Sequence, residues 1–154
     1  MYKLSKNITF FKKFKKFFFP FYKSKDIKKL FNILEKGKQK EVQVAMFVGG
    51  CVRKFLTYEN IDDIDIASTF SPEELKEKFK ESEFKVIETG IEHGSVTVVL
   101  KTSKFEITKL RQDTKTDGRH AEVLFTNYWK DDSNRRDFSS SVHINCINSK
   151  ISSV

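Results

Sequence analysis

The stretch that decides the fold is residues 47–68, which read F-V-G-G-C-V-R-K-F-L-T-Y-E-N-I-D-D-I-D-I-A-S. Apolar side chains alternate over residues 44–48, as in a strand, and Gly49 and Gly50 then allow a sharp turn with exposed amides. Beyond the turn, apolar residues recur at helical spacing, which predicts a helix with Arg53 on its first turn. The amides and the positive dipole end of such a helix favour anions, so the turn is a candidate phosphate site.

A second strand is predicted over residues 61–67, after the chain reverses. Side chains of a strand alternate between faces, so Asp63 and Asp65 point the same way while Ile64 and Ile66 point into a core. By the rise per residue, the two carboxylates stand about 7 Å apart along the strand. Carboxylate oxygens suit a hard cation such as Mg²⁺, and such an ion suits attack of a hydroxyl on a triphosphate. The predicted chemistry is nucleotidyl transfer.

The glycine turn and the two spaced aspartates are more specific together, in this order and spacing, than either is alone. A G-G step is usually a plain turn, and a D-I-D at a strand end is usually a solvated edge. Together, however, G-G-x-V-R-x-x-L followed by D-x-D-I-A resembles the head domain of the class II tRNA nucleotidyltransferases, the CCA-adding enzymes, and of the bacterial poly(A) polymerases of the same superfamily. The resemblance implies an α/β head, with a small mixed, mostly antiparallel sheet, helices against one face and the site on the other.

The resemblance also implies a reaction and assigns residues to it. The family carries out a two-metal, in-line attack of an RNA 3′-hydroxyl, here the end of a tRNA, on the α-phosphate of CTP or ATP. Asp63 and Asp65 would hold Mg²⁺. In the R-R-D-F signature, Arg135 would reach the nucleotide through its planar donor fork, and Asp137 would support the ribose side. The full set implied to bind the nucleotide is Gly49, Gly50, Arg53, Arg135 and Asp137.

A third acid is expected on a later strand. Strands are predicted over residues 84–89, 95–100 and 104–110, which complete a mixed sheet. Alternation along the last strand places Glu106 on the face opposite Phe105 and Ile107. Spacing alone favours an ordinary exposed glutamate. The resemblance favours a catalytic role, because F-E-I-T with a following Arg matches the strand that carries the third acid of the family.

Other stretches predict scaffold and loops. Ser24 precedes an apolar stripe at helical spacing that ends at Gly37, and Ser71 begins a helix-capping signature with Pro and Glu. Residues 112–120 are predicted to form a mobile polar loop, which resembles the flexible loop of the family. Residues 122–138 are predicted to form a strand end and then a helix that runs into R-R-D-F.

The net charge of +8 is unevenly distributed. Residues 1–40 hold 13 Lys and two acidic residues, whereas the remainder has a net charge of −3. We therefore divide the chain into a basic Lys/Phe-rich arm (1–23), a head domain (24–138) and an atypical Ser-rich tail (139–154) that is expected to be truncated or altered in reading frame. The arm attracts polyanions such as RNA or an anionic membrane surface, although packing on the domain or partial disorder is favoured over a membrane-surface helix.

Isolated histidines and cysteines indicate no further chemistry. His93 and His120 have no acid or base partner at a fixed spacing, so both are interpreted as surface or loop residues. Cys51 and Cys146 lack metal-ligand spacing and are interpreted as free thiols. No apolar run is long enough for a membrane-spanning segment, and a cytoplasmic location is the default expectation.

Several functions stay open at this point. After Phe138 the T-I-N-A of the family is missing, as are the E-D-x-x-R selection motif and the helical body and tail. The chain is therefore expected to act as a catalytic head, with a body and tail polypeptide encoded separately, or to be a decayed or split-gene fragment without unaided activity. Poly(A) synthesis is a further alternative to CCA addition, because the two reactions share this head. A non-catalytic RNA-binding module built on the Lys/Phe arm is the alternative from another class.

Overall fold

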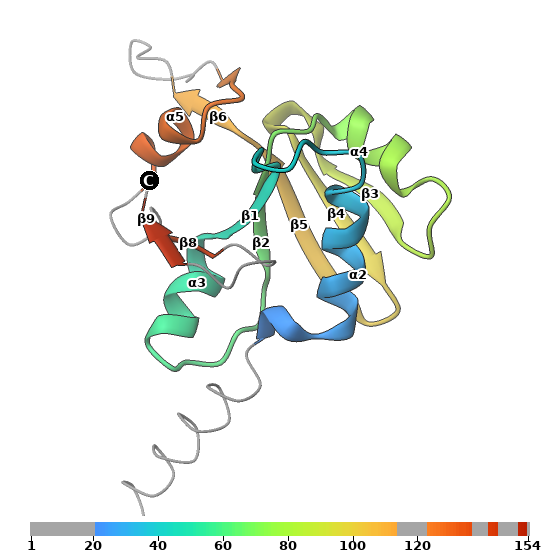
Figure 1. Cartoon of the computed structure of the whole chain (residues 1–154), viewed down its shortest axis with the longest axis horizontal. Helices are drawn as coiled ribbons and strands as arrows, with labels where there is room; N and C mark the ends of the chain where they lie inside the picture. Colours follow the sequence, from blue (N-terminus) through green and yellow to red (C-terminus); the bar gives the residue numbers. More distant parts are fainter. Residues whose placement is uncertain (1–20, 114–122, 137–141, 145–150, 154) are drawn as a thin grey trace, which may run out of the picture.

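The computed structural model describes residues 21–113, 123–136, 142–144 and 151–153, and its architecture is shown in Figure 1. Within these residues, one seven-stranded sheet has the strand order β3-β4-β5-β2-β1-β8-β9. Its strands are β1 (Ala45–Val48), β2 (Asp65–Ser68), β3 (Lys85–Gly90), β4 (Ser95–Leu100), β5 (Ser103–Lys109), β8 (Val142–Ile144) and β9 (Ile151–Ser153). A separate ribbon pairs β6 (Arg111–Asp113) with β7 (Val123–Phe125).

The sheet is mixed and mostly antiparallel, as predicted. Among its pairs, only β2 and β5 run parallel, with Asp65 aligned with Glu106 and Ile66 aligned with Ile107. The other neighbouring strands pair in the antiparallel sense. Because the chain returns from β2 through a helix and a hairpin before adding β5, the parallel pair lies inside the sheet with partners on both sides.

Three helices cover one face of the sheet: α2 (Lys25–Leu34), α3 (Gly49–Leu56) and α4 (Pro72–Phe79). Local signals begin two of them. The Ser24 hydroxyl accepts from the Ile27 amide at the start of α2, and Ser71 and Glu74 form a reciprocal capping box at the start of α4. Two short 3₁₀ turns, η1 (Phe21–Lys23) and η2 (Ile91–His93), are the other helical elements described before residue 123 in the sequence.

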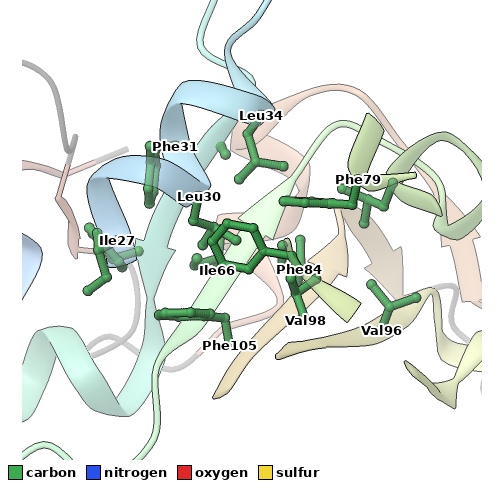
Figure 2. Packing of buried hydrophobic residues seen from close by; sticks show 14 of the residues in the cluster. Ile27, Leu30, Phe31, Leu34, Ile66, Phe79, Phe84, Val96, Val98 and Phe105 are labelled. Carbon is green, nitrogen blue, oxygen red and sulfur yellow. The ribbon is translucent and has the colours of Figure 1, made fainter. Parts of the chain in front are cut away.

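The core lies between these helices and the sheet. Figure 2 shows side chains of α2 and α4 against β2, β4 and β5, and the Phe31 ring lies 4.9 Å from that of Phe47 on β1. On the opposite face a small cluster of Val48, Ala67 and Leu110 receives Trp129 from the short helix α5 (Trp129–Asn134). Helices against one face are therefore confirmed, with α5 as an addition on the other face.

Three element boundaries differ from the sequence predictions. The second strand begins at Asp65 and not at residue 61, although the carbonyl of Ile64 already accepts from the Glu106 amide. Helix α3 has only eight residues and starts at Gly49, so Arg53 belongs to its last turn. The predicted loop over residues 112–120 begins inside β6, and its part from residue 114 lies outside the described residues.

The proposed division of the chain at residues 23 and 138 stays a prediction. Most of the arm lies outside the described residues, but its last part packs on the domain, with the Phe21 ring 5.0 Å from Phe47 and 5.6 Å from Phe55. Cys51 is a buried free thiol whose pKa burial raises to about 11, whereas Cys146 is outside the described residues. Among the described helices, none combines the length and apolar character that crossing a membrane requires.

A pair of identical substitutions on the sheet tests where the core lies. Ile107 is fully buried on β5, whereas Ile87 on β3 is 40% exposed. We expect Ile107→Val to lower the free energy of unfolding by about 1 kcal/mol, because it leaves a methyl-sized cavity, and Ile87→Val to change it by less than about 0.5 kcal/mol. Urea denaturation of both variants measures this difference, and equal losses would contradict the assigned core.

Candidate functional site

A cavity of about 390 Å³ opens on the face of the sheet away from α2 and α4. It combines carboxylates from the middle of the sheet with arginines from the segments that follow β5. Its lining residues are Val48, Asp65, Ile66, His93, Ser95, Glu106, Thr108, Arg111, Arg135 and Arg136. A cavity lined by both signs of charge suits a ligand that is itself an anion bound to a cation.

The carboxylates stand on the two parallel strands. Asp65 and Glu106 are aligned in the register of β2 and β5, so their side chains share a face and their Cα atoms are about 5 Å apart. Because Ile66 and Ile107 occupy the alternate positions and are fully buried, this face is fixed by the core on the other side. The sequence prediction that Glu106 shares a face with Asp65 agrees with this register.

The glycine turn lies directly against Asp65. Gly49 has φ +67°, and a Cβ atom there would lie 3.2 Å from Asp65 Oδ2. Gly50, at the start of α3, donates its amide to the Asp65 carboxylate. The turn was predicted to present its amides to a phosphate, and in this structure one of them holds the acid.

The surroundings of Asp65 disfavour the ionised form of its carboxyl. Burial raises the pKa of the Asp65 carboxyl above its usual value, and the neighbouring Asp63 carboxylate raises it further, while Arg136, the Gly50 amide and Lys54 oppose the rise. Both raising causes disfavour a negative charge, and a nearby cation would relieve them. Asp65 is therefore the described carboxylate with the most to gain from a bound metal ion.

Asp63 lies at the edge of this arrangement. It is exposed, precedes β2 and is not among the residues that line the cavity, although its charge reaches Asp65. Within the described part of the chain, no group of three or more His, Cys, Asp or Glu side chains is arranged as a metal site. The donors present are the carboxylate oxygens of Asp65, Asp63 and Glu106, a type of ligand that fits a hard cation such as Mg²⁺.

Arginines form the other wall of the cavity. Arg135 and Arg136 follow the end of α5, and their side chains are only 13% and 14% exposed. Both are held by Asp132, which is 1% exposed and lies 2.7 Å from Arg135 Nη2 and 2.6 Å from Arg136 Nε. Arg111 comes from the start of β6, and its guanidinium donates to the His93 carbonyl at 3.4 Å.

The structure brings together part of the predicted set. Gly49, Gly50, Asp65, Glu106 and Arg135 lie in or against the cavity. Arg53 is exposed on the last turn of α3 and does not line the cavity. Asp137 lies outside the described residues, as does His120.

Sequence reasoning missed four residues of this site. Arg111, Arg136 and His93 line the cavity, and the last of these was predicted to be an ordinary surface residue. His93 is exposed and contacts Glu92 at 3.6 Å, so it forms part of the cavity rim. Asp132 was also missed. Its position three and four residues before the two arginines is the spacing of side chains that meet on a helix, and that signal was available in the sequence.

Comparison with known proteins places this fold and cavity in a class. Residues 45–153 match the family model described as the poly A polymerase head domain, which covers well over half of the chain. The chain therefore belongs to the poly A polymerase head domain family. The resemblance to the CCA-adding enzymes that the motifs indicated is confirmed over this head region.

Curated relatives are tRNA nucleotidyltransferases. The chain is 43% identical over 102 residues to the mitochondrial CCA tRNA nucleotidyltransferase 1 of Danio rerio, which covers 66% of this chain and 23% of the relative. It is 44% identical over 97 residues to a CCA-adding enzyme of Lactobacillus delbrueckii, covering 62% of this chain and 24% of the relative. The chain thus spans about a quarter of the length of these relatives.

Solved structures share the fold. The CCA-adding enzyme of Bacillus stearothermophilus in complex with CTP has a TM-score of 0.65 and 30% identity, over 84% of this chain and 30% of that one. A tRNA nucleotidyltransferase complexed with a primer tRNA and an incoming ATP analogue has a TM-score of 0.53 and 22% identity, over 72% of this chain and 31% of that one. At 22% identity, the second comparison shows only that the fold is shared.

The raised pKa of Asp65 predicts how the stability of the folded chain depends on pH. Above that pKa, the ionised carboxyl is less favourable in the folded chain than in the unfolded chain. We expect Asp65→Asn to raise the melting temperature at pH 7, and this gain should vanish in acid, where Asp65 is protonated in both states. The exposed Asp62, which pairs with Lys54 at 2.9 Å, is the matched control, and Asp62→Asn should give no gain. Thermal melts from pH 3 to pH 7 provide the test, and a loss of stability for Asp65→Asn at pH 7 would contradict it.

Proposed function

We propose that this chain supplies the nucleotide site of an RNA nucleotidyltransferase that acts on the 3′ end of tRNA. The observation that carries this proposal is the cavity in which Asp65 and Glu106, on paired strands, face Arg111, Arg135 and Arg136. A nucleoside triphosphate with Mg²⁺ has the complementary charges. The motif match and the relatives named above also support this function.

In this proposal, each wall of the cavity has a separate task. Asp65, together with Asp63 and Glu106, would hold Mg²⁺, and the ion would supply activation of the attacking hydroxyl and neutralisation of charge on the leaving pyrophosphate. The arginines bind and orient the triphosphate of CTP or ATP, since guanidinium groups match phosphate oxygens in pairs. The Gly50 amide orients Asp65, and the buried face of β2 prevents that carboxylate from turning away.

The two family reactions differ in the nucleotide that they need. CCA addition uses CTP and then ATP, whereas poly(A) synthesis uses ATP alone. The match to a head domain named for poly(A) polymerase keeps the second reaction as an alternative to the first.

Nucleotide binding is the first expected result, because it needs only the site. Trp129 packs on Val48, which lines the cavity, so its fluorescence should report the bound ligand. We expect CTP and ATP to bind in the presence of Mg²⁺ and at least 10-fold more weakly without it. Arg135→Gln should weaken binding about 10-fold or more, because a charged hydrogen bond to phosphate is lost.

A matched control is Lys85→Gln, since Lys85 is an exposed cation on the same domain that does not line the cavity. It should change the affinity by less than about 2-fold. No binding by the wild-type chain at millimolar nucleotide would refute the proposed site. Incorporation of labelled CTP or ATP onto tRNA that lacks its CCA end then tests the reaction, and its persistence in an Asp63→Ala and Asp65→Ala double variant would refute the assigned acids.

A further inference from the structure

Asp132 is a buried carboxylate in contact with arginines of the cavity, and neither the motifs nor the proposed chemistry uses it. It is 1% exposed, and both of its oxygens accept hydrogen bonds. Oδ1 accepts from Arg135 Nε at 2.8 Å and from the Arg111 amide at 3.2 Å, and Oδ2 accepts from Arg136 Nε at 2.6 Å. One side chain thus contacts all three arginines of the cavity.

These contacts also fix the peptide group of Arg111. Its amide donates to Asp132, and its carbonyl accepts from Arg135 Nε at 3.1 Å. The start of β6 is therefore joined to the end of α5 by the Asp132–Arg135 pair. Two segments separated by more than twenty residues meet through this one carboxylate, and their relative position sets where each guanidinium reaches the cavity.

Asp132 holds both later arginines, and the Arg111 carbonyl adds one hydrogen bond to Arg135. Helix α5 ends at Asn134, so Arg135 and Arg136 lie beyond its last turn. An arginine side chain has many rotamers, and confining it costs up to about 2 kcal/mol of conformational free energy. A buried ion pair is weak support for stability as such, because desolvation offsets much of its attraction. Its more specific effect here is to place the two guanidinium groups.

We propose that Asp132 is a positioning residue that arranges Arg111, Arg135 and Arg136 as a fixed array for a polyphosphate. The array makes the cavity prefer a chain of phosphates over a single phosphate group, because a chain carries more charge and more oxygens to pair with three fixed guanidinium groups. The identity of the natural ligand as a nucleoside triphosphate rests on the proposed function, but the array itself does not.

Charge and position predict opposite results for Asp132→Asn. The substitution removes a negative charge beside three arginines, so charge alone would strengthen anion binding. If Asp132 acts by position, binding of tripolyphosphate should instead weaken by at least 10-fold, while binding of orthophosphate should change by less than about 2-fold. Calorimetric titration of the full chain with both ions measures this, below the melting temperature of each variant. The neighbouring Asp131, which accepts from Thr126 Oγ1 at 3.0 Å, supplies the control substitution Asp131→Asn, for which no change is expected.

A double-mutant cycle separates positioning from a general loss of structure. In a chain that carries Arg135→Gln and Arg136→Gln, adding Asp132→Asn should cause less than about a 2-fold further loss in tripolyphosphate affinity. An equal loss in both backgrounds would show a purely structural role and overturn the proposal. Unchanged or tighter binding by Asp132→Asn alone would also overturn it.

The two proposals can fail separately. Asp132-dependent binding of tripolyphosphate without binding of CTP or ATP would refute the proposed function and support the array. Binding of nucleotides that is unaffected by Asp132→Asn would support the function and refute the array. A wild-type chain that binds none of these ions would refute both.

Discussion

The parallel pairing of β2 with β5 is the constraint on which both the core and the site depend. It places Ile66 beside Ile107 under the helices and, one residue earlier on each strand, Asp65 beside Glu106 on the open face. A shift of one residue in this register would expose the isoleucines and bury the acids. The hydrophobic free energy of the core therefore holds the Asp65 and Glu106 carboxylates on one face, and the pKa of Asp65 is raised there, chiefly by burial and next by the Asp63 carboxylate.

Much of the fold was predictable because its signals are local. The caps at Ser24 and Ser71, the glycine turn and the alternating strands each involve residues only a few positions apart. A predicted boundary was wrong where side-chain packing on the core continued beyond the hydrogen-bonded strand. Ile61 and Ile64 pack against the core, so apolar packing extends back to residue 61, whereas the paired ladder of β2 begins at Asp65.

The site was less predictable because most of its parts are non-local. Gly49, Asp65 and Arg135 carry motif signals, but no spacing in the sequence shows that β6 and the end of α5 meet. Arg111 and Arg136 each stand in a quoted motif, but nothing in the sequence showed that their side chains line the same cavity. Asp132 was missed for a different reason, since an acid within a polar run is usually solvated and this one is buried.

The separation of charge in the cavity bears on how ligands would enter it. A cation alone is attracted by Asp65 and Glu106 but meets three arginines, whereas a polyphosphate alone is attracted by the arginines but meets the acids. A cation and a polyphosphate bound together satisfy both walls and screen each other's repulsion. By linkage, each must then raise the affinity for the other by the same factor. Such coupling disfavours occupation by free anions or free metal ions, and it follows from acids fixed by the core on one wall and arginines gathered around Asp132 on the other.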